Sequence, residues 1–269
     1  MQIRCKCQVL LLDEVFKQRG GLAVVMLSKS DIHKSTMQYY SRFCCANLLE
    51  LEHGVYFICS TERNRVLKGC GCKYSLYILL KDDLCVVAYS PALQDFAETL
   101  KNSQSDNIIA AAEDKYRLKK MRLLIFQREN VLQYGNAKIL NVEDYPLFEA
   151  FFRKTHPTAN HAGWLSEYFI EKASKGYFAG YFKDGRLVSV CDAPDMPYME
   201  DRIQHTGIIT LEEERQKGYG KLTAALATHH LLQMGICPQW ECNVENIASF
   251  ELAKSIGYKE FGKAYILEG

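Results

Sequence analysis

The alternation of apolar and polar residues is most informative between residues 207 and 235. An apolar run at 207–211 predicts a strand, and the charged run 212–217 predicts a turn. Leucine and alanine then recur at helical spacing over 221–234, and Gly235 provides a stop. A strand, a turn and a helix N-terminus are therefore expected in direct succession.

The same pattern divides the rest of the chain into mixed strands and helices. Strands are expected at 2–12, 22–27, 55–59, 74–80, 84–89, 121–127, 137–140, 177–182, 187–192, 238–243 and 258–267. Helices are expected at 31–52 (capped by Asp31), 91–100, 108–120, 141–153, 164–174 and 246–256. Residues 101–107 are the most linker-like stretch. The order predicts an α/β protein with a mixed sheet.

Composition narrows the class of protein. The chain has 269 residues, of which 48% are hydrophobic, enough to bury a sizeable core. A formal net charge of +1 lacks the basic excess of nucleic-acid or anionic-membrane binders, and no run reaches the ~18 apolar residues of a spanning helix. We therefore expect neither a nucleic-acid partner nor a membrane partner.

The eleven cysteines do not form the paired spacing of a zinc site. Most lie in apolar, strand-like segments, where a reduced cysteine behaves as a small hydrophobic residue. This predicts reduced thiols, no metal ion and a cytoplasmic location.

The turn before the 221–234 helix carries the clearest chemistry. The first amides of a helix lack intrahelical partners, and the helix dipole places partial positive charge beside them. Gly218 and Gly220 are expected to let the backbone approach an anion, since neither has a side chain. The segment therefore predicts a site for phosphate or pyrophosphate.

Arg215, Gly218 and Gly220 form the pattern Arg-x-x-Gly-x-Gly, which resembles the signature of the GNAT acetyltransferase superfamily. Asn246 with Ser249, followed by the Gly-Tyr pair at 257–258, is similar to a second segment of that superfamily. Residues 192–199 also resemble a bacterial branch that has an extra N-terminal region.

The resemblance implies a GNAT-like catalytic domain with a splayed central sheet at 134–269, preceded by a smaller mixed α/β domain at 1–133. The smaller domain is expected to add walls to the acceptor pocket or a dimer surface, and a degenerate copy of the same fold is an alternative. Acetyl-CoA is implied as co-substrate. The implied binding residues are Ile209, Thr210, Leu211, Arg215, Gln216, Lys217, Gly218, Tyr219, Gly220, Asn246 and Ser249.

An amine attacks a thioester only as the neutral form, so a proton acceptor helps. Glu241 on the strand expected at 238–243 and His205 just before the strand at 207–211 are the candidates, with Glu212 in the turn as a third. Glu241 alternates with Trp240 and Cys242, and a desolvated cleft is expected to raise its pKa. The tyrosine that serves as general acid in many relatives is missing, because Leu252 and Ala253 occupy its place.

The predicted function is direct transfer of an acetyl group to a primary amine of a small molecule or peptide. The acceptor itself is left open, as is a homodimer. A non-catalytic acyl-CoA-binding or interaction protein is the alternative.

Overall fold

The computed structural model describes residues 26–101, 103–127 and 133–269. The strand expected at 2–12 and most of the one at 22–27 lie outside these residues. Among the described residues, no helix is both long and apolar enough to cross a membrane.

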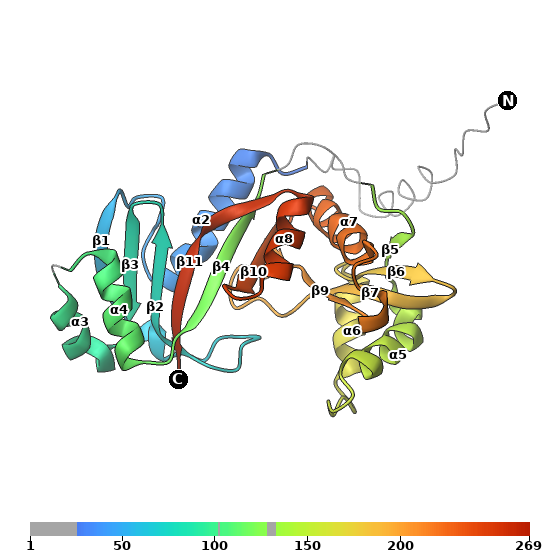
Figure 1. Ribbon diagram of the computed structural model, residues 1–269, viewed down its shortest axis with the longest axis horizontal. Coiled ribbons are helices and arrows are strands. Elements are labelled where there is room, and N and C mark those ends of the chain that lie inside the picture. The colour runs from blue at the N-terminus through green and yellow to red at the C-terminus, as the bar shows by residue number, and fades with distance from the viewer. Residues whose placement is uncertain (1–25, 102, 128–132) are drawn as a thin grey trace.

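The described strands form two sheets (Figure 1). The larger, in the order β1-β3-β2-β11-β4-β10-β8, contains β1 (Gly54–Cys59), β2 (Tyr74–Lys81), β3 (Leu84–Tyr89), β4 (Lys119–Phe126), β8 (Ile203–His205), β10 (Cys237–Asn243) and β11 (Tyr258–Glu268). The smaller, in the order β5-β6-β7-β9, contains β5 (Ala137–Ile139), β6 (Ala179–Lys183), β7 (Arg186–Asp192) and β9 (Gly207–Thr210). The mixed α/β expectation is confirmed.

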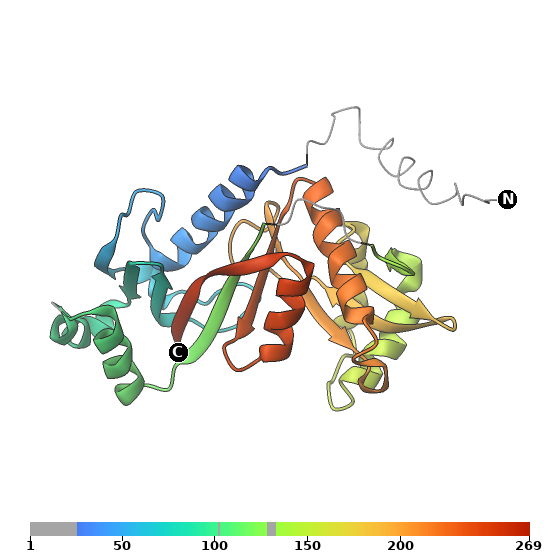
Figure 2. The same cartoon turned by 45° about the horizontal axis from the view of Figure 1, so that its top comes forward.

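Helices cover both faces of both sheets (Figures 1 and 2). The α-helices are α2 (Lys29–Cys44), α3 (Gln94–Leu100), α4 (Ser105–Lys115), α5 (Tyr145–Thr155), α6 (Leu165–Ser174), α7 (Tyr219–Gln233) and α8 (Ile247–Ile256). Short 3-10 helices lie at η1 (Thr61–Asn64), η2 (Pro91–Leu93), η3 (Val142–Asp144) and η4 (Glu212–Glu214).

Successive side chains of a strand point to opposite faces of its sheet and therefore pack against different helices. On β2, Tyr77 and Leu79 are buried in the cluster that includes α2, whereas Leu76 and Ile78 are buried with α3 and α4. In the smaller sheet, Val188 packs with the aromatic residues of α5 and α6. Two core layers therefore lie on opposite faces of each sheet.

The chain changes sheet at Thr206. On its N-terminal side, β8 pairs in parallel with β10, with His205 opposite Gln239. The Thr206 amide donates to the Gln239 carbonyl at 3.2 Å, the last such bond, and β9 then pairs with β7 from Gly207 onward. The two sheets consequently diverge from this residue, which gives the splayed arrangement that the GNAT resemblance implies.

The expected domain boundary at 133/134 falls between two strands of different sheets. β4 comes from the first part of the chain, yet it lies between β10 and β11 and pairs antiparallel with both. β11 also pairs with β2, so hydrogen bonds join strands from both sides of the boundary. The division stays a prediction, while the larger sheet runs across it.

Two helix caps differ from expectation. Ser28 caps α2, and Asp31 occupies the third helical position, where its side chain closes a capping box. The helix ends at Cys44 rather than near residue 52, because Cys45 adopts a left-handed conformation with φ 52°. The start of the helix therefore lies within one turn of the expected position, whereas its end lies more than two turns earlier than expected.

A fragment comprising residues 134–269 is expected not to fold alone. It lacks β4, whose Leu123, Leu124, Ile125 and Phe126 are buried. At about 1.5–3 kcal/mol each, these four side chains are comparable to the ~5–15 kcal/mol of a whole domain. Circular dichroism melting should show no cooperative transition, and co-expression with residues 1–133 should restore one. A cooperative melt of the isolated fragment would contradict this expectation.

Candidate active site

The divergence of the sheets leaves two strand edges open. β9 pairs with β7 on one side, and among the described residues no strand pairs with its other side. β10 pairs with β8 only as far as Gln239. A wedge therefore opens between β9 and the second half of β10, where backbone groups of both strands are available to a ligand.

The N-terminus of α7 lies beside this wedge. Gly218 caps the helix in a left-handed conformation with φ 85°, and Gln216 also has positive φ. The Leu222 amide donates to the Gly218 carbonyl at 3.1 Å, which leaves the earlier amides of the first turn without an intrahelical partner. With the helix dipole, these amides are suited to an anion, and the phosphate site expected from the sequence stays a prediction.

The two glycines of the turn serve different needs. A Cβ on Gly218 would meet no atom within 4 Å, so its glycine is favoured by the positive φ and by the open space in front of the helix. A Cβ on Gly220 would lie 3.1 Å from Thr210 Oγ1. Gly220 therefore lets the helix lie close to β9, and the approach of an anion expected at both glycines stays a prediction.

Glu214 joins the turn before α7 to the β6–β7 hairpin through ion pairs. Its side chain is 3% exposed, with Lys183 Nζ at 3.0 Å, Lys217 Nζ at 2.9 Å and Arg186 Nη2 at 3.4 Å. Hydrogen bonds from Lys217 and Lys183 lower its pKa to about 2. The carboxylate thus stays ionised at neutral pH and is surrounded by cations.

The other residues expected to bind the cofactor are positioned as follows. Ile209 and Thr210 lie on the open strand β9, and Arg215 Nε donates to the Thr210 carbonyl at 3.3 Å. Leu211 is buried, and its amide donates to the Val188 carbonyl, so its amide is already used. Tyr219 stacks on Tyr181 with ring centroids 4.5 Å apart.

The second signature segment has internal structural roles. Asn246 caps α8 by accepting a hydrogen bond from the Ser249 amide at 3.1 Å. Ser249 Oγ accepts from Trp240 Nε1 at 3.0 Å. Leu252, at the place of the missing tyrosine, lies near the α7 turn, with its Cδ2 at 3.9 Å from a Cβ built on Gly220. Binding by Asn246 and Ser249 stays a prediction.

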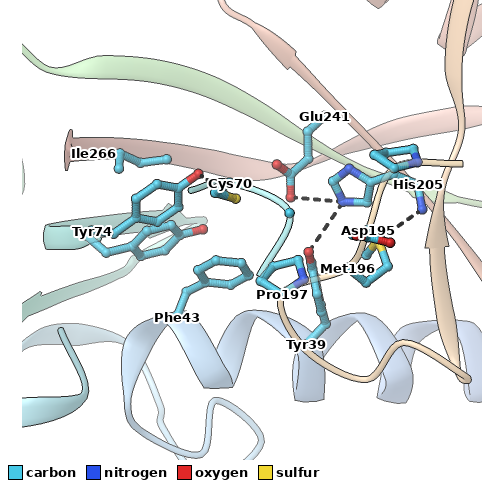
Figure 3. Close-up of a pocket in the computed structure, with 13 residues that line it drawn as sticks. Tyr39, Phe43, Cys70, Tyr74, Asp195, Met196, Pro197, His205, Glu241 and Ile266 are labelled. Atoms are coloured by element: carbon cyan, nitrogen blue, oxygen red, sulfur yellow. Dashed lines mark hydrogen bonds and ion pairs between the residues drawn. The ribbon is translucent and has the colours of Figure 1, made fainter. Parts of the chain in front are cut away.

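A pocket of about 160 Å³ lies on the face that α2 covers. Its aromatic wall is formed by Tyr39, Phe43, Tyr74 and Tyr77. Its polar lining includes Cys70, Asp195, His205 and Glu241 (Figure 3). The aromatic wall and Cys70 come from the first part of the chain, whereas the other polar groups come from the second.

Glu241 and His205 meet at one end of this pocket (Figure 3). His205 Nε2 lies 3.5 Å from Glu241 Oε1 and 3.5 Å from the Tyr39 hydroxyl. The Tyr40 hydroxyl donates to Glu241 Oε1 at 3.0 Å. Since His205 precedes Thr206, this pair lies at the point where the sheets diverge.

The pKa of Glu241 shifts in the opposite direction to the sequence-based expectation. Burial raises it, but the charge and hydrogen bond of His205 and the hydrogen bond from Tyr40 act against burial, and the net pKa is lowered. The expectation of a raised pKa is therefore wrong. Glu241 is ionised at neutral pH, and its carboxylate is a weaker base than we expected.

Glu212 does not belong to this group, since it is exposed in η4 and does not line the pocket.

Asp192, which we did not consider as an acid or base, lies closer than Glu212 to the point where the sheets diverge, because it pairs with Gly207 at the start of β9. A Cβ on Gly207 would lie 2.1 Å from Asp192 Oδ1, and burial raises the pKa of Asp192. A carboxylate as the last residue of the apolar strand 187–192 was the signal available in the sequence.

The structure thus combines an open pair of strand edges, a helix N-terminus without intrahelical partners and a pocket lined by both parts of the chain. Comparison with known proteins assigns the family. The family model described as GNAT acetyltransferase matches residues 87–267. The chain belongs to the GNAT acetyltransferase family, and the match begins well before the expected boundary.

Two relatives illustrate the similarity. The curated "Uncharacterized N-acetyltransferase YdfB" of Bacillus subtilis (strain 168) is 29% identical over 108 residues, covering 39% of this chain and 40% of that protein. A GNAT-family acetyltransferase from Colwellia psychrerythraea matches in structure with a TM-score of 0.50 and 16% identity, covering 71% of this chain and 80% of that one. The structural match supports the fold, whereas the first match spans less than half of the curated relative.

Gly218→Asn is expected to abolish stabilisation by CoA while leaving the fold intact. Asparagine tolerates left-handed φ, so the turn keeps its shape, but the new side chain occupies the space in front of the helix. The matched control is Gly235→Asn, since Gly235 also has positive φ (73°) and no atom within 4 Å of a built Cβ. Thermal melting with and without CoA should show a shift in the control only. Equal shifts in both variants would rule out the α7 turn as the anion site.

The acid stability of the protein should depend on Glu214. Its pKa is lowered to about 2 in the folded state, from about 4.3 when unfolded. A lowered folded pKa contributes stability that is complete above the unfolded pKa and lost as the pH falls toward 2. Glu214→Gln should therefore reduce the melting temperature at neutral pH, and the difference from wild type should narrow as the pH falls through 4. A constant difference over that range would exclude this role.

Proposed function

We propose that the protein transfers an acetyl group from acetyl-CoA directly to a primary amine. One observation carries the proposal: the His205–Glu241 pair adjoins the start of β9, where the sheets diverge, and the turn that begins α7 follows the end of the same strand. A long phosphorylated donor and an amine acceptor need such an arrangement, because their reacting ends must meet.

The residues around the wedge suit acetyl-CoA. The free amides at Gly218, Tyr219 and Gly220 would hold the pyrophosphate, and the open edges of β9 and β10 would bind the pantetheine arm. When bound, acetyl-CoA supplies a thioester whose acetyl carbon accepts the nitrogen lone pair of the amine as the C–S bond breaks.

The chain's own residues would then handle the acceptor proton. Glu241 is ionised and lies 3.5 Å from His205 Nε2, so it stabilises a proton that His205 takes from the ammonium form of the acceptor. Tyr39 and Tyr40 hold the pair in place through their hydroxyls. The departing thiolate has no tyrosine acid at Leu252, so positioning and the α7 dipole would assist its departure.

Leu252 also favours a second candidate, a protein that binds acyl-CoA without turnover. It would keep the α7 turn and need no proton acceptor. Release of CoA thiol in the presence of a panel of amines separates the two, since a binding protein releases none above the uncatalysed rate.

Glu241→Gln should lower kcat by roughly 10²-fold or more at neutral pH, because it removes the charge that supports proton acceptance. Raising the pH should restore part of the rate by deprotonating the acceptor in solution. The thermal shift with CoA should be unchanged. The measurement is thiol release across pH.

Glu212→Gln is the matched control, because that carboxylate is exposed and lies outside the pocket. Its turnover should stay close to wild type. If Glu241→Gln retains normal turnover at every pH, Glu241 is structural, and Asp192 becomes the next residue to test.

A further inference from the structure

The charges around the pocket are one-sided. Its described lining contains two carboxylates, Asp195 and Glu241, and no lysine or arginine. The phenols of Tyr39 and Tyr77 are kept neutral, since burial raises both pKa values well above their usual value. A ligand in this pocket therefore meets negative charge and aromatic rings.

The two carboxylates differ in their counter-charges. Asp195 Oδ1 lies 2.6 Å from Nζ of Lys172, a lysine that is fully buried, and the pKa of Asp195 is lowered by that hydrogen bond. Glu241 has no such lysine or arginine partner among the described residues; its contacts are the Tyr40 hydroxyl and His205. Asp195 is thus neutralised by a lysine, whereas the charge that lowers the Glu241 pKa is that of His205, and Glu241 loses this counter-charge when His205 is neutral and able to accept a proton.

A buried, ionised carboxylate is costly unless a cation accompanies it. The pocket beside Glu241 is the place from which a ligand would supply that cation. Tyr39 and Phe43 line the same pocket, and aromatic rings accommodate both an ammonium group and the alkyl chain that carries it.

We propose that the acceptor is a compact alkyl amine that binds as its ammonium ion at Glu241 and carries no carboxylate or phosphate. This inference rests on the proposed function, because it specifies the substrate class of the same site. An anionic group on the acceptor would lie near Glu241 in a small pocket without a lysine or arginine to receive it.

Titration calorimetry on the full chain without acetyl-CoA tests the inference with three probes of similar size: 1,4-diaminobutane, pentylamine and 4-aminobutanoate. The two amines without a carboxylate should bind at least about 100-fold more tightly than 4-aminobutanoate. Glu241→Gln should weaken their binding at least about tenfold and reduce the discrimination. Glu251→Gln, which changes an exposed carboxylate on α8, should bind all three as wild type does.

Comparable affinity for 4-aminobutanoate and pentylamine, or binding of none of the three, would overturn the inference. So would full discrimination in Glu241→Gln. The proposed function fails separately, if CoA gives no thermal shift or no amine releases thiol. Turnover of 4-aminobutanoate at the rate of pentylamine would leave the function standing and refute the acceptor class.

Discussion

The single hydrogen bond between the Thr206 amide and the Gln239 carbonyl marks the constraint on which the site depends. Up to that bond the chain belongs to the larger sheet, and after it β9 belongs to the smaller one. Had β9 continued along β10, its open edge would be filled by ladder hydrogen bonds. The interrupted pairing instead leaves backbone groups available, with His205 before the start of β9 and the α7 turn after its end.

Two carboxylates, the buried Glu214 and the partly buried Glu241, show how environment assigns different roles to the same side chain. Glu214 has three cations around it and accepts hydrogen bonds from all three, so it fixes the shape of the turn before α7. Glu241 accepts a hydrogen bond from one hydroxyl, that of Tyr40, and has a histidine beside it in place of a lysine or arginine, which suits it to the cationic ligand proposed above. The first contributes to stability and the second is suited to recognition, and both are ionised at neutral pH.

Local signals in the sequence explain why the α7 turn could be predicted. Gly218 and the helix that follows lie within one short segment, so strand, turn and helix N-terminus follow from neighbouring residues. The face of β10 on which the Glu241 side chain lies was also predictable, because the buried side chains of Trp240 and Cys242 alternate with it along the strand.

The partners of Glu241 could not be predicted in this way. Tyr40 lies 201 positions away on α2, and nothing near Glu241 in the sequence indicates that a phenol will donate to it. The wrong direction for the Glu241 pKa follows first from the charge and hydrogen bond of His205 and then from the Tyr40 hydrogen bond, because burial alone would have raised it. The insertion of β4 between β10 and β11 is equally non-local, since its apolar run fits any buried strand.

The central position of β11 has a consequence for biosynthesis. Arg122 on β4 bonds to Glu260 on β11 across 138 residues of chain, and β2 needs the same late strand as its neighbour. Such a high contact order slows folding, because much of the chain must be ordered before these contacts form. While the ribosome is still adding residues 258–268, β2 and β4 each present an unpaired edge, so the nascent chain depends on being shielded from aggregation until its last described strand emerges.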